Sequence, residues 1–400
     1  MTRHTSPIAA PLLALVVALA GCSGKDEADS PAAAPAAQQA VPPRTQIPPP
    51  PELKARSYIV LDHDSGRVLA ALEPDSRQEP ASLTKLMTAY GVFHALKEGR
   101  IKLTDMVTIS ENAWKMEGSK MFVEVGKQVS VENLLQGMIV QSGNDATVAL
   151  AEYVGGTEAT FVQMMNTYAK QLGMTGSHFT NTAGMPDPEH YVTARDIAVL
   201  ASALIHEFPE YYKWYSQKEF TWNGITQQNR NGLLWRDPTV DGVKTGHTES
   251  AGYCLVTSAK REGMRLVSAV LGTDSMRARE DASEALLGYG FNFFETRRLY
   301  AAGEPLTTAR VWKGTAAEVG LALNRDLYIT GQRGQMGSVQ AVFELPERLV
   351  APLSAQAPIG KVNIVVDGAT IATHDLYPAT DVPQGGILRR MIDTVRLWFD

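Results

Sequence analysis

The distribution of apolar and polar positions predicts a mixed α/β section followed by a strand-rich one. Two short apolar runs, 57–61 and 67–70, are separated by the polar segment 62–66, and together they predict a β-hairpin. Apolar residues then recur at helical spacing through a section that extends to about residue 203. Within it, 131–140 is predicted as a helix that leads into a polar loop.

Strand patterns return after this helical section. The segment 240–243 has the pattern of a short strand, and apolar runs around Cys254 and over 266–271 predict its neighbours. A helix over about 281–287 is expected to close the domain. Strands from both ends of a domain around an internal helical section imply a mixed α/β (α+β) sandwich over residues 53–298, with a site in the cleft.

Residues 299–384 have a different pattern. Short alternating apolar segments are separated there by Gly and Asp turns, which predicts a small all-β C-terminal domain. No catalytic constellation is found in it. We expect it to hold the first domain at a distance or to contact partners.

The last segment, 385–400, reads as an amphipathic helix. One face carries apolar residues: Leu388, Met391, Ile392, Val395, Trp398 and Phe399. The arginines lie off this face, a pattern typical of a helix that lies in a membrane interface. The aromatic end of the chain favours such an anchor. The alternative is a helix that docks on its own β domain.

The N-terminal segment, 1–21, reads as an export signal, with an apolar stretch too short for a comfortable transmembrane helix. The segment 18–20 fits a signal peptidase site, whereas 19–22 resembles a bacterial lipoprotein box. The second interpretation is favoured and predicts lipidation of Cys22. Residues 22–52 are rich in Ala and Pro and are expected to form a disordered tether.

Composition narrows the function. Of the 400 residues, 44% are hydrophobic, which supports at least one large core, and the formal net charge of -6 argues against nucleic acid as a partner. Cys22 and Cys254 give no disulfide framework, and Cys254 stands in an apolar run that predicts burial. The histidines show no metal-ligand spacing, so we expect no metal and no cofactor.

Three polar motifs carry the chemistry. Ser82 stands three residues before Lys85, a spacing that places the hydroxyl and the amine on one face of a helix. The motifs Ser142-Gly-Asn144 and Lys244-Thr245-Gly246 follow in that order. Alone, the first is usually a solvated helix face and the others are usually turns. Their ordered combination indicates an enzyme with a serine nucleophile.

The residue types suit acyl transfer. A serine hydroxyl is too weak an acid to attack an amide unaided, so Ser82 needs a base. Lys85 can serve if burial and a second cation, for which Lys244 is the candidate, keep it neutral. Ser142 can relay a proton to the leaving amine. Asn144 can orient Lys85 and hold the substrate backbone.

The same pattern suggests how an oxyanion would be stabilised. The backbone N–H groups of Ser82 and of His247, the residue after Lys-Thr-Gly, are the candidate donors. Histidine is a common acid–base residue, but here the base role is filled by lysine. We therefore do not expect the His247 side chain to be the base.

The motifs and their surroundings resemble a known family. The similarity runs from about Ser57 to the C-terminus and includes the segments 80–85, 141–146, 229–231 and 241–248. In these segments the chain resembles the low-molecular-mass penicillin-binding proteins, the serine D-alanyl-D-alanine carboxypeptidases of peptidase family S11. The resemblance implies the fold of penicillin-recognising serine transferases and β-lactamases.

The resemblance also implies substrates and roles. The terminal D-Ala of peptidoglycan pentapeptide stems would be removed through an acyl-enzyme on Ser82, which β-lactams would also acylate. Lys85 would accept the proton and Ser142 would relay it. Lys244, Thr245, Gly246 and His247 would bind substrate. Arg230 would pair with the substrate carboxylate, because its planar fork suits bidentate recognition, although a surface arginine in a turn is the alternative.

Three other functions are weighed. A β-lactamase would need a group that activates the deacylating water, and no glutamate can be placed for it. A D,D-endopeptidase that cuts crosslinks could use the same site, although related endopeptidases lack the added β domain. A non-catalytic wall-binding or shape-maintaining protein is the third.

The implied location is the periplasmic face of a bacterial envelope membrane. The C-terminal helix favours the inner membrane, whereas Ser23 after Cys22 would favour the outer one in enteric-type sorting.

Overall fold

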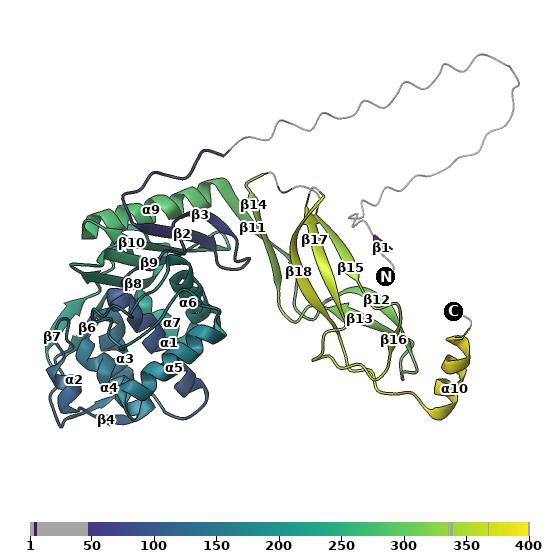
Figure 1. The fold of residues 1–400 in the computed structure, drawn as a ribbon, viewed down its shortest axis with the longest axis horizontal. Coiled ribbons are helices and arrows are strands. Elements are labelled where there is room, and N and C mark those ends of the chain that lie inside the picture. The colour runs from purple at the N-terminus through teal and green to yellow at the C-terminus, as the bar shows by residue number, and fades with distance from the viewer. Residues whose placement is uncertain (1–3, 6–46, 335, 337–338, 367, 399–400) are drawn as a thin grey trace, which may run out of the picture. The chain divides into compact units, whose positions relative to one another are not determined.

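The chain forms two compact units in a computed structural model that describes residues 4–5, 47–334, 336, 339–366 and 368–398. The first unit comprises residues 48–299 and 327–333, and the second holds 300–326 and the described residues from 334 onwards, together with those up to Ile47 (Figure 1). The predicted export signal, Cys22 and nearly all of the predicted tether lie outside the described residues.

A five-stranded antiparallel sheet forms the centre of the first unit. Its strand order is β3-β2-β10-β9-β8, so β8 lies at one edge. The strands are β2 (Ser57–Asp62), β3 (Val68–Leu72), β8 (Val240–Thr248), β9 (Gly252–Arg261) and β10 (Met264–Thr273). The predicted hairpin is confirmed, since β2 pairs with β3, and Cys254 is fully buried on β9 as expected.

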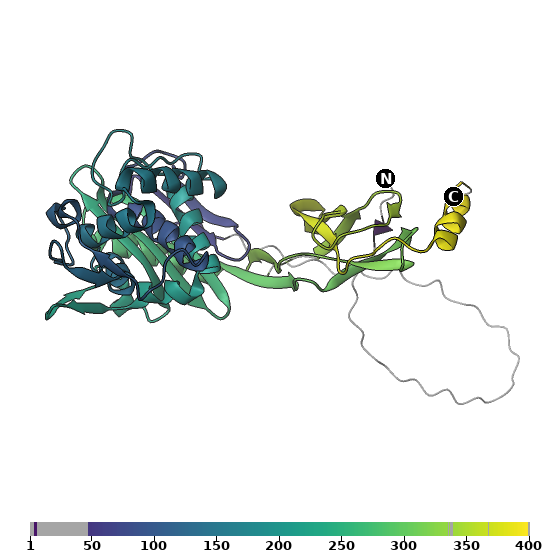
Figure 2. The same cartoon turned by 90° about the horizontal axis from the view of Figure 1, so that it is seen from below.

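Helices cover both faces of this sheet. Figures 1 and 2 show α9 (Met276–Phe293) on one face and the remaining large helices on the other. Those helices are α1 (Lys85–Lys97), α3 (Val131–Val140), α4 (Asn144–Gly155), α5 (Glu158–Gln171) and α6 (Ala194–Glu207). The predicted helix 131–140 is confirmed. The predicted helix 281–287 is longer than expected, because Ser275 accepts a hydrogen bond from the Ala278 N–H and caps the helix a turn and a half earlier.

Smaller elements complete the unit. Short helices are η1 (Ala81–Thr84), α2 (Glu111–Lys115), α7 (Pro209–Tyr212), η2 (Lys213–Ser216) and α8 (Leu233–Arg236). Paired strands are β4 (Met106–Thr108) with β5 (Gln128–Ser130), β6 (Glu219–Trp222) with β7 (Ile225–Gln228), and β11 (Phe294–Tyr300) with β14 (Leu327–Gln332).

Helix α1 is the centre of the helical layer. It is buried nearly all round, with Leu86, Met87 and Phe93 fully shielded from solvent. A helix with apolar residues on every side belongs in a core rather than at a surface. Because close-packed interiors resist displacement, the residues at the start of α1 have a rigid support.

The second unit is strand-rich, as predicted. Its sheet has the order β1-β15-β17-β18-β13-β12-β16. The strands are β1 (His4–Thr5), β12 (Pro305–Trp312), β13 (Glu318–Ala322), β15 (Val339–Glu344), β16 (Leu349–Val350), β17 (Gly360–Val366) and β18 (Ala369–Pro378). Leu321, Val362, Ile364 and Leu376 are fully buried and form its core.

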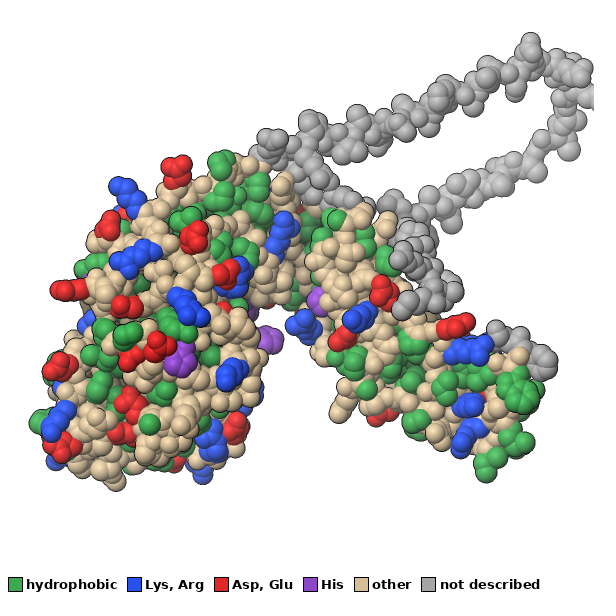
Figure 3. All heavy atoms as spheres, viewed as in Figure 1, with side chains coloured by type: hydrophobic (Ala, Val, Ile, Leu, Met, Phe, Trp, Pro, Cys, Tyr) green, Lys and Arg blue, Asp and Glu red, His purple; other side chains and the backbone are tan. Residues whose placement is uncertain are grey.

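The last described helix is α10 (Ile387–Arg396), which contacts the β domain of the second unit through its polar side. The Asp393 carboxylate accepts a hydrogen bond of 2.7 Å from the Lys313 N–H, and the Arg389 guanidinium donates to the Thr315 carbonyl. The apolar side chains instead face solvent, where Figure 3 shows them gathered at the end of the unit. No described helix has both the length and the apolar character required to cross a membrane.

Candidate active site

The predicted nucleophile lies on a tight turn. Ser82 is the second residue of the 3-10 helix η1, and Lys85 begins α1 directly after it. The Ser-x-x-Lys pair therefore spans a 3-10 turn and the start of α1 rather than one continuous helix. Ala81 precedes the serine at φ 47°, in the left-handed region that L residues rarely adopt. The Lys85 Nζ lies 3.0 Å from the Ser82 Oγ.

The Lys85 amine is buried among neutral oxygen atoms. It donates to the Ser82 Oγ, to the Asn144 Oδ1 at 2.7 Å and to the Ala183 carbonyl at 2.7 Å. Burial, and after it the charge of Arg230, lower the pKa of Lys85 to about 7, while Asp145 acts in the opposite direction. Near neutral pH a large fraction of this amine is thus uncharged.

Ser142 and Asn144 occupy the connection between α3 and α4. Ser142 has φ 63°, another left-handed residue, and is only 3% exposed. The Asn144 amide nitrogen donates to the Glu117 carbonyl at 2.5 Å, which leaves the amide oxygen facing Lys85. The loop conformation therefore sets the orientation of both side chains.

Lys244 approaches the same point from the edge strand β8. Its Nζ donates to the Ser142 Oγ at 2.9 Å and to the Thr245 carbonyl at 3.1 Å. Burial lowers the pKa of Lys244 well below its usual value, with further contributions from Lys85, Arg230 and Arg279.

Arg230 adds a cation that sequence reasoning did not weigh. Its charge lowers the pKa of both Lys85 and Lys244. Repulsion between the two lysines also lowers the pKa of Lys244, so the two buried amines disfavour each other's charged form. Unlike a buried lysine, an arginine keeps its charge.

The rest of the Lys-Thr-Gly strand packs closely on η1. A Cβ at Gly246 would lie 2.8 Å from the Pro80 carbonyl, so only glycine allows β8 to approach the turn this closely. Thr245 is buried beside Lys244. The His247 side chain is exposed, and its ring lies 4.0 Å, centroid to centroid, from that of Tyr253.

Arg230 follows β7 with an exposed side chain. Its charge lowers the pKa of both Lys85 and Lys244. Its carbonyl accepts a hydrogen bond from Arg279, a buried α9 residue that also donates to the Gly246 carbonyl. Asn231 donates to the Gly242 carbonyl and connects the same segment to β8.

The structure thus gathers Ser82, Lys85, Ser142, Asn144, Lys244 and Thr245 at one place, with Gly246 against the turn and Arg230 and His247 at the exposed margin.

Sequence reasoning missed three contributors: the Ala183 carbonyl, Asp145 and Arg279. Asp145 accepts the backbone N–H groups of Met121 and Phe122, both at 2.8 Å, and so holds the loop above Asn144. Within the described residues, no group of His, Cys, Asp and Glu has the arrangement of a metal site.

Comparisons with known proteins identify the family of this chain. The sequence profile of the D-alanyl-D-alanine carboxypeptidase family, peptidase S11, matches residues 44–275, and that of the penicillin-binding protein 5 C-terminal domain matches residues 294–384. D-alanyl-D-alanine carboxypeptidase DacA of Haemophilus influenzae is 47% identical over 86% of this chain and 89% of its own length. DacA of Escherichia coli strain K12 is 43% identical over 89% and 90%.

A solved structure shows the same fold. Penicillin-binding protein 5 from Haemophilus influenzae superposes with a TM-score of 0.78 at 47% identity, covering 84% of this chain and 99% of that one. Its likeness includes the penicillin-recognising architecture with a C-terminal β domain. The active-site geometry, the family profile and relatives of this identity lead to one conclusion: the chain belongs to the D-alanyl-D-alanine carboxypeptidase family, peptidase family S11.

Proposed function

We propose that this D-alanyl-D-alanine carboxypeptidase removes the terminal D-Ala of peptidoglycan pentapeptide stems through an acyl-enzyme on Ser82. The observation that carries the proposal is the environment of the Lys85 amine. Two of its three hydrogen-bond partners, the Asn144 Oδ1 and the Ala183 carbonyl, can only accept. The third, the Ser82 hydroxyl at 3.0 Å, can also donate.

These partners favour proton transfer from the Ser82 hydroxyl to the Lys85 amine. A neutral Lys85 amine has two N–H groups, which the Asn144 and Ala183 oxygens bind, and one lone pair, which is left for the Ser82 hydroxyl. Lys85 then accepts the proton as the Ser82 Oγ attacks the peptide carbonyl carbon, and the acyl ester forms. Because the pKa of Lys85 is about 7, the base is available near neutral pH.

The leaving D-Ala amine needs a proton. The Ser142 Oγ accepts a hydrogen bond of 2.9 Å from the Lys244 amine, and Asn144, two residues further along the same loop, accepts one from the Lys85 amine. It is the proposed relay to the leaving nitrogen. The backbone N–H groups of Ser82 and His247 are the proposed oxyanion donors.

The substrate carboxylate would supply a negative charge beside the cationic side chains of the site. In the described residues no ion pair involves either Lys85 or Lys244, although both are nearly inaccessible to solvent. A carboxylate near Arg230, Lys244 and Thr245 would stabilise the charged forms there. β-Lactams carry a carboxylate next to a strained amide, so the same site would be acylated by them.

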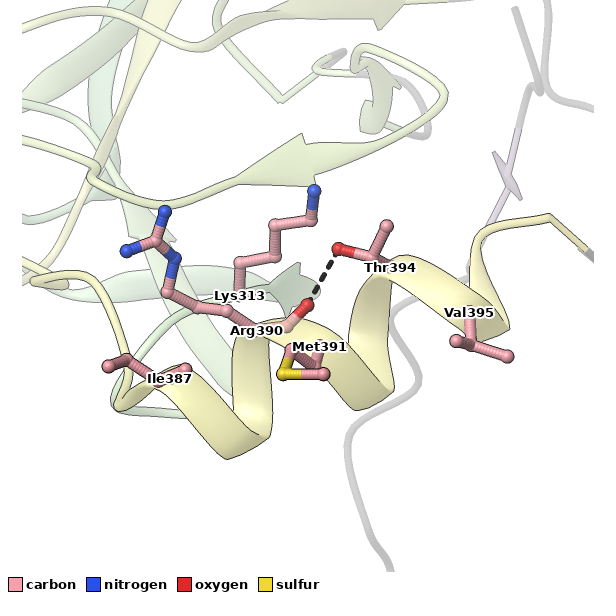
Figure 4. Close-up of a pocket in the computed structure, with 6 residues that line it drawn as sticks. All are labelled: Lys313, Ile387, Arg390, Met391, Thr394 and Val395. Atoms are coloured by element: carbon pink, nitrogen blue, oxygen red, sulfur yellow. Dashed lines mark hydrogen bonds between the residues drawn. The ribbon is translucent and has the colours of Figure 1, made fainter.

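Attachment to an envelope membrane is the proposed location. The apolar face of α10 is open to solvent, with Leu388 at 78% and Trp398 at 81% exposed. Figure 4 shows Ile387, Met391 and Val395 lining a surface pocket beside the Lys313 and Arg390 cations. Cys22, the proposed lipid attachment site, would add a second anchor.

The test is release of free D-Ala by the full-length chain from a peptide ending in Lys-D-Ala-D-Ala. We expect release from the wild-type protein and none from Ser82→Ala. Ser216→Ala, an exposed serine on the other described 3-10 turn, is the matched control and should retain activity. Release that survives in Ser82→Ala would overturn the assignment, and cleavage of crosslinked dimers without D-Ala release would replace it with the D,D-endopeptidase function.

A further inference from the structure

A buried histidine outside the three motifs contacts the turn that carries the proposed nucleophile. His190 is 2% exposed, and its Nε2 lies 2.8 Å from the Thr84 Oγ1. Thr84 is the last residue of η1 and directly precedes Lys85. The Thr84 hydroxyl also donates to the Ala81 carbonyl at 2.9 Å, closing the turn around Ser82.

The hydrogen bonds assign the tautomer of this histidine. The Thr180 N–H and the Asn181 side-chain amide both lie 3.2 Å from the His190 Nδ1, and both groups donate to it. The Nδ1 is therefore the acceptor, and the Nε2 carries the hydrogen. The ring donates to the Thr84 Oγ1, which leaves the threonine hydrogen for the Ala81 carbonyl. Burial lowers the pKa of His190 to about 4, which keeps this neutral form at physiological pH.

The turn needs such support because its backbone is strained. Ala81 is held at φ 47°, and its carbonyl is the oxygen to which the Thr84 hydroxyl donates. The same oxygen faces Gly184, where a Cβ would lie only 1.7 Å away. The segment that holds His190 therefore contacts the turn on two sides, and it also supplies the Ala183 carbonyl to Lys85.

We propose that His190 and Thr84 form a positioning link that holds the strained η1 turn so that the Ser82 hydroxyl faces the Lys85 amine. His190 touches neither substrate nor the reacting atoms in this role, so it acts through Thr84. The inference rests on the proposed role of Ser82 as the nucleophile. It assigns a function in catalysis to a residue outside the three motifs.

The chain offers a matched control for a purely structural role. Thr88, one turn further along α1, is also fully buried, and its hydroxyl donates to the Thr182 carbonyl at 2.7 Å. Thr88→Val thus removes one buried hydrogen bond between the same helix and the same segment without touching η1. Thr84→Val removes the link itself at almost unchanged side-chain volume.

The test measures acylation of the full-length chain by a fluorescent penicillin, separating non-covalent affinity from the acylation rate constant. We expect Thr84→Val and His190→Leu to lower the rate constant on the order of tenfold or more, with affinity retained, because small displacements of reacting groups have large effects on rate. Thr88→Val should acylate as the wild type does. His190→Gln should recover part of the rate, since its amide N–H can reach Thr84.

A crystal structure of Thr84→Val tests the positioning role without depending on turnover. We expect the distance between the Ser82 Oγ and the Lys85 Nζ to increase beyond hydrogen-bonding range. An unchanged distance, or equal acylation rates for Thr84→Val and Thr88→Val, would overturn the positioning role. A wild-type chain that neither releases D-Ala nor is acylated, in which Thr84→Val still displaces Ser82, would instead overturn the proposed function and leave the link supported.

Discussion

At the residue scale, the reactivity of the site depends on charges around the Lys85 amine. Burial alone disfavours its ammonium form, and the Arg230 guanidinium adds to this effect. Asp145 opposes both, since a carboxylate favours the charged amine. Removing either charged neighbour should therefore move the pH dependence of acylation, in a direction that the sign of the charge determines.

Arg230→Gln is expected to shift the rising limb of the acylation pH profile to higher pH. Loss of the cation favours the Lys85 ammonium, which raises its pKa, so more alkaline solution is needed to reach the same neutral fraction. The shift should be on the order of half a pH unit or more. The measurement is the rate of acylation by a β-lactam between pH 5 and 9, in roughly half-unit steps across the range where a pKa near 7 titrates.

Arg230→Lys is the matched control for this prediction. A lysine keeps the positive charge, so the pH profile should stay in place, but it lacks the planar fork that binds a carboxylate in bidentate fashion. We therefore expect weaker peptide binding, seen as a higher KM for D-Ala release, without a pH shift. Equal profile shifts in both variants would contradict the electrostatic role of Arg230.

The sequence predicted the residues of the three motifs, but it did not predict everything that acts on them. Ser82 and Lys85 could be recognised because a hydroxyl and an amine stood at a helical spacing, and Asn144 because its motif follows theirs in the expected order. The Ala183 contribution is a backbone carbonyl 98 residues away from Lys85, and a carbonyl leaves no signature in a sequence. Arg279 was missed for a similar reason, since a lone arginine on α9 reads as a surface residue until its burial is known.

At the scale of elements, two connections shape the site more than the helices do. One is the loop before β5 that Asp145 holds, and the other is the segment between α5 and α6 that contains Ala183 and Gly184. Helix and strand periodicity predicted α3 and the β2–β3 hairpin well. Neither connection shows a helical or strand periodicity in its hydrophobic residues. Their backbone conformations depend on hydrogen bonds from buried side chains to the backbone, which the sequence pattern does not reveal.

Gly184→Ala is expected to abolish most acylation, while Gly173→Ala should not. Both glycines have positive φ, which by itself should cost each alanine variant about 1 kcal/mol of folding free energy. Only at Gly184 would the new Cβ collide with the Ala81 carbonyl, whereas a Cβ at Gly173 has no neighbour within 4 Å. The η1 turn must then move away from Lys85.

The measurement pairs thermal unfolding with β-lactam acylation for both glycine variants. A lower melting temperature for Gly184→Ala than for Gly173→Ala, with acylation lost only in Gly184→Ala, would support the close approach at Ala81. Normal acylation in a folded Gly184→Ala protein would show that the turn tolerates the displacement.

Asp145→Asn tests the second connection. The carboxylate accepts from the backbone N–H groups of Met121, Phe122 and Val123, and an amide of the same shape can accept fewer and weaker bonds. We expect the free energy of unfolding to fall by about 1–3 kcal/mol. Because Asp145 also favours the charged form of Lys85, the rising limb of the acylation profile should move to lower pH, opposite to Arg230→Gln. Denaturant unfolding and the pH profile measure the two effects, and a shift to higher pH would contradict the assignment.

At the scale of the whole molecule, the predicted boundary at 298/299 falls within β11, and the first unit also includes β14. The reason is a set of partly buried hydroxyl contacts, in which the Thr330 Oγ1 on β14 lies 2.6 Å from the Ser65 Oγ and 2.8 Å from the Thr296 Oγ1. A strand so far along the chain looked like part of the β domain, because period-two alternation does not reveal which sheet a strand joins.

The apolar face of α10 is exposed to solvent. Asp393 and Arg389 bind α10 to the β domain, so the helix does dock on that domain, through its polar side, while its apolar side chains stay exposed. Ile387, Leu388 and Met391 are 63–78% exposed. A surface of this kind is characteristic of helices that insert their apolar face into a lipid interface.

Replacing two residues of this face, Leu388→Gln with Met391→Gln, should weaken vesicle binding of a Cys22→Ala chain, which lacks the proposed lipid site. Full burial of such a side chain contributes about 1.5–3 kcal/mol, so even partial insertion predicts a loss of on the order of tenfold or more in the partition coefficient. Thr394→Ala is the control, because its hydroxyl only bonds the Arg390 carbonyl within the helix. Flotation with phosphatidylglycerol-containing vesicles measures the binding. Unchanged binding of the double variant would place membrane attachment elsewhere in the chain.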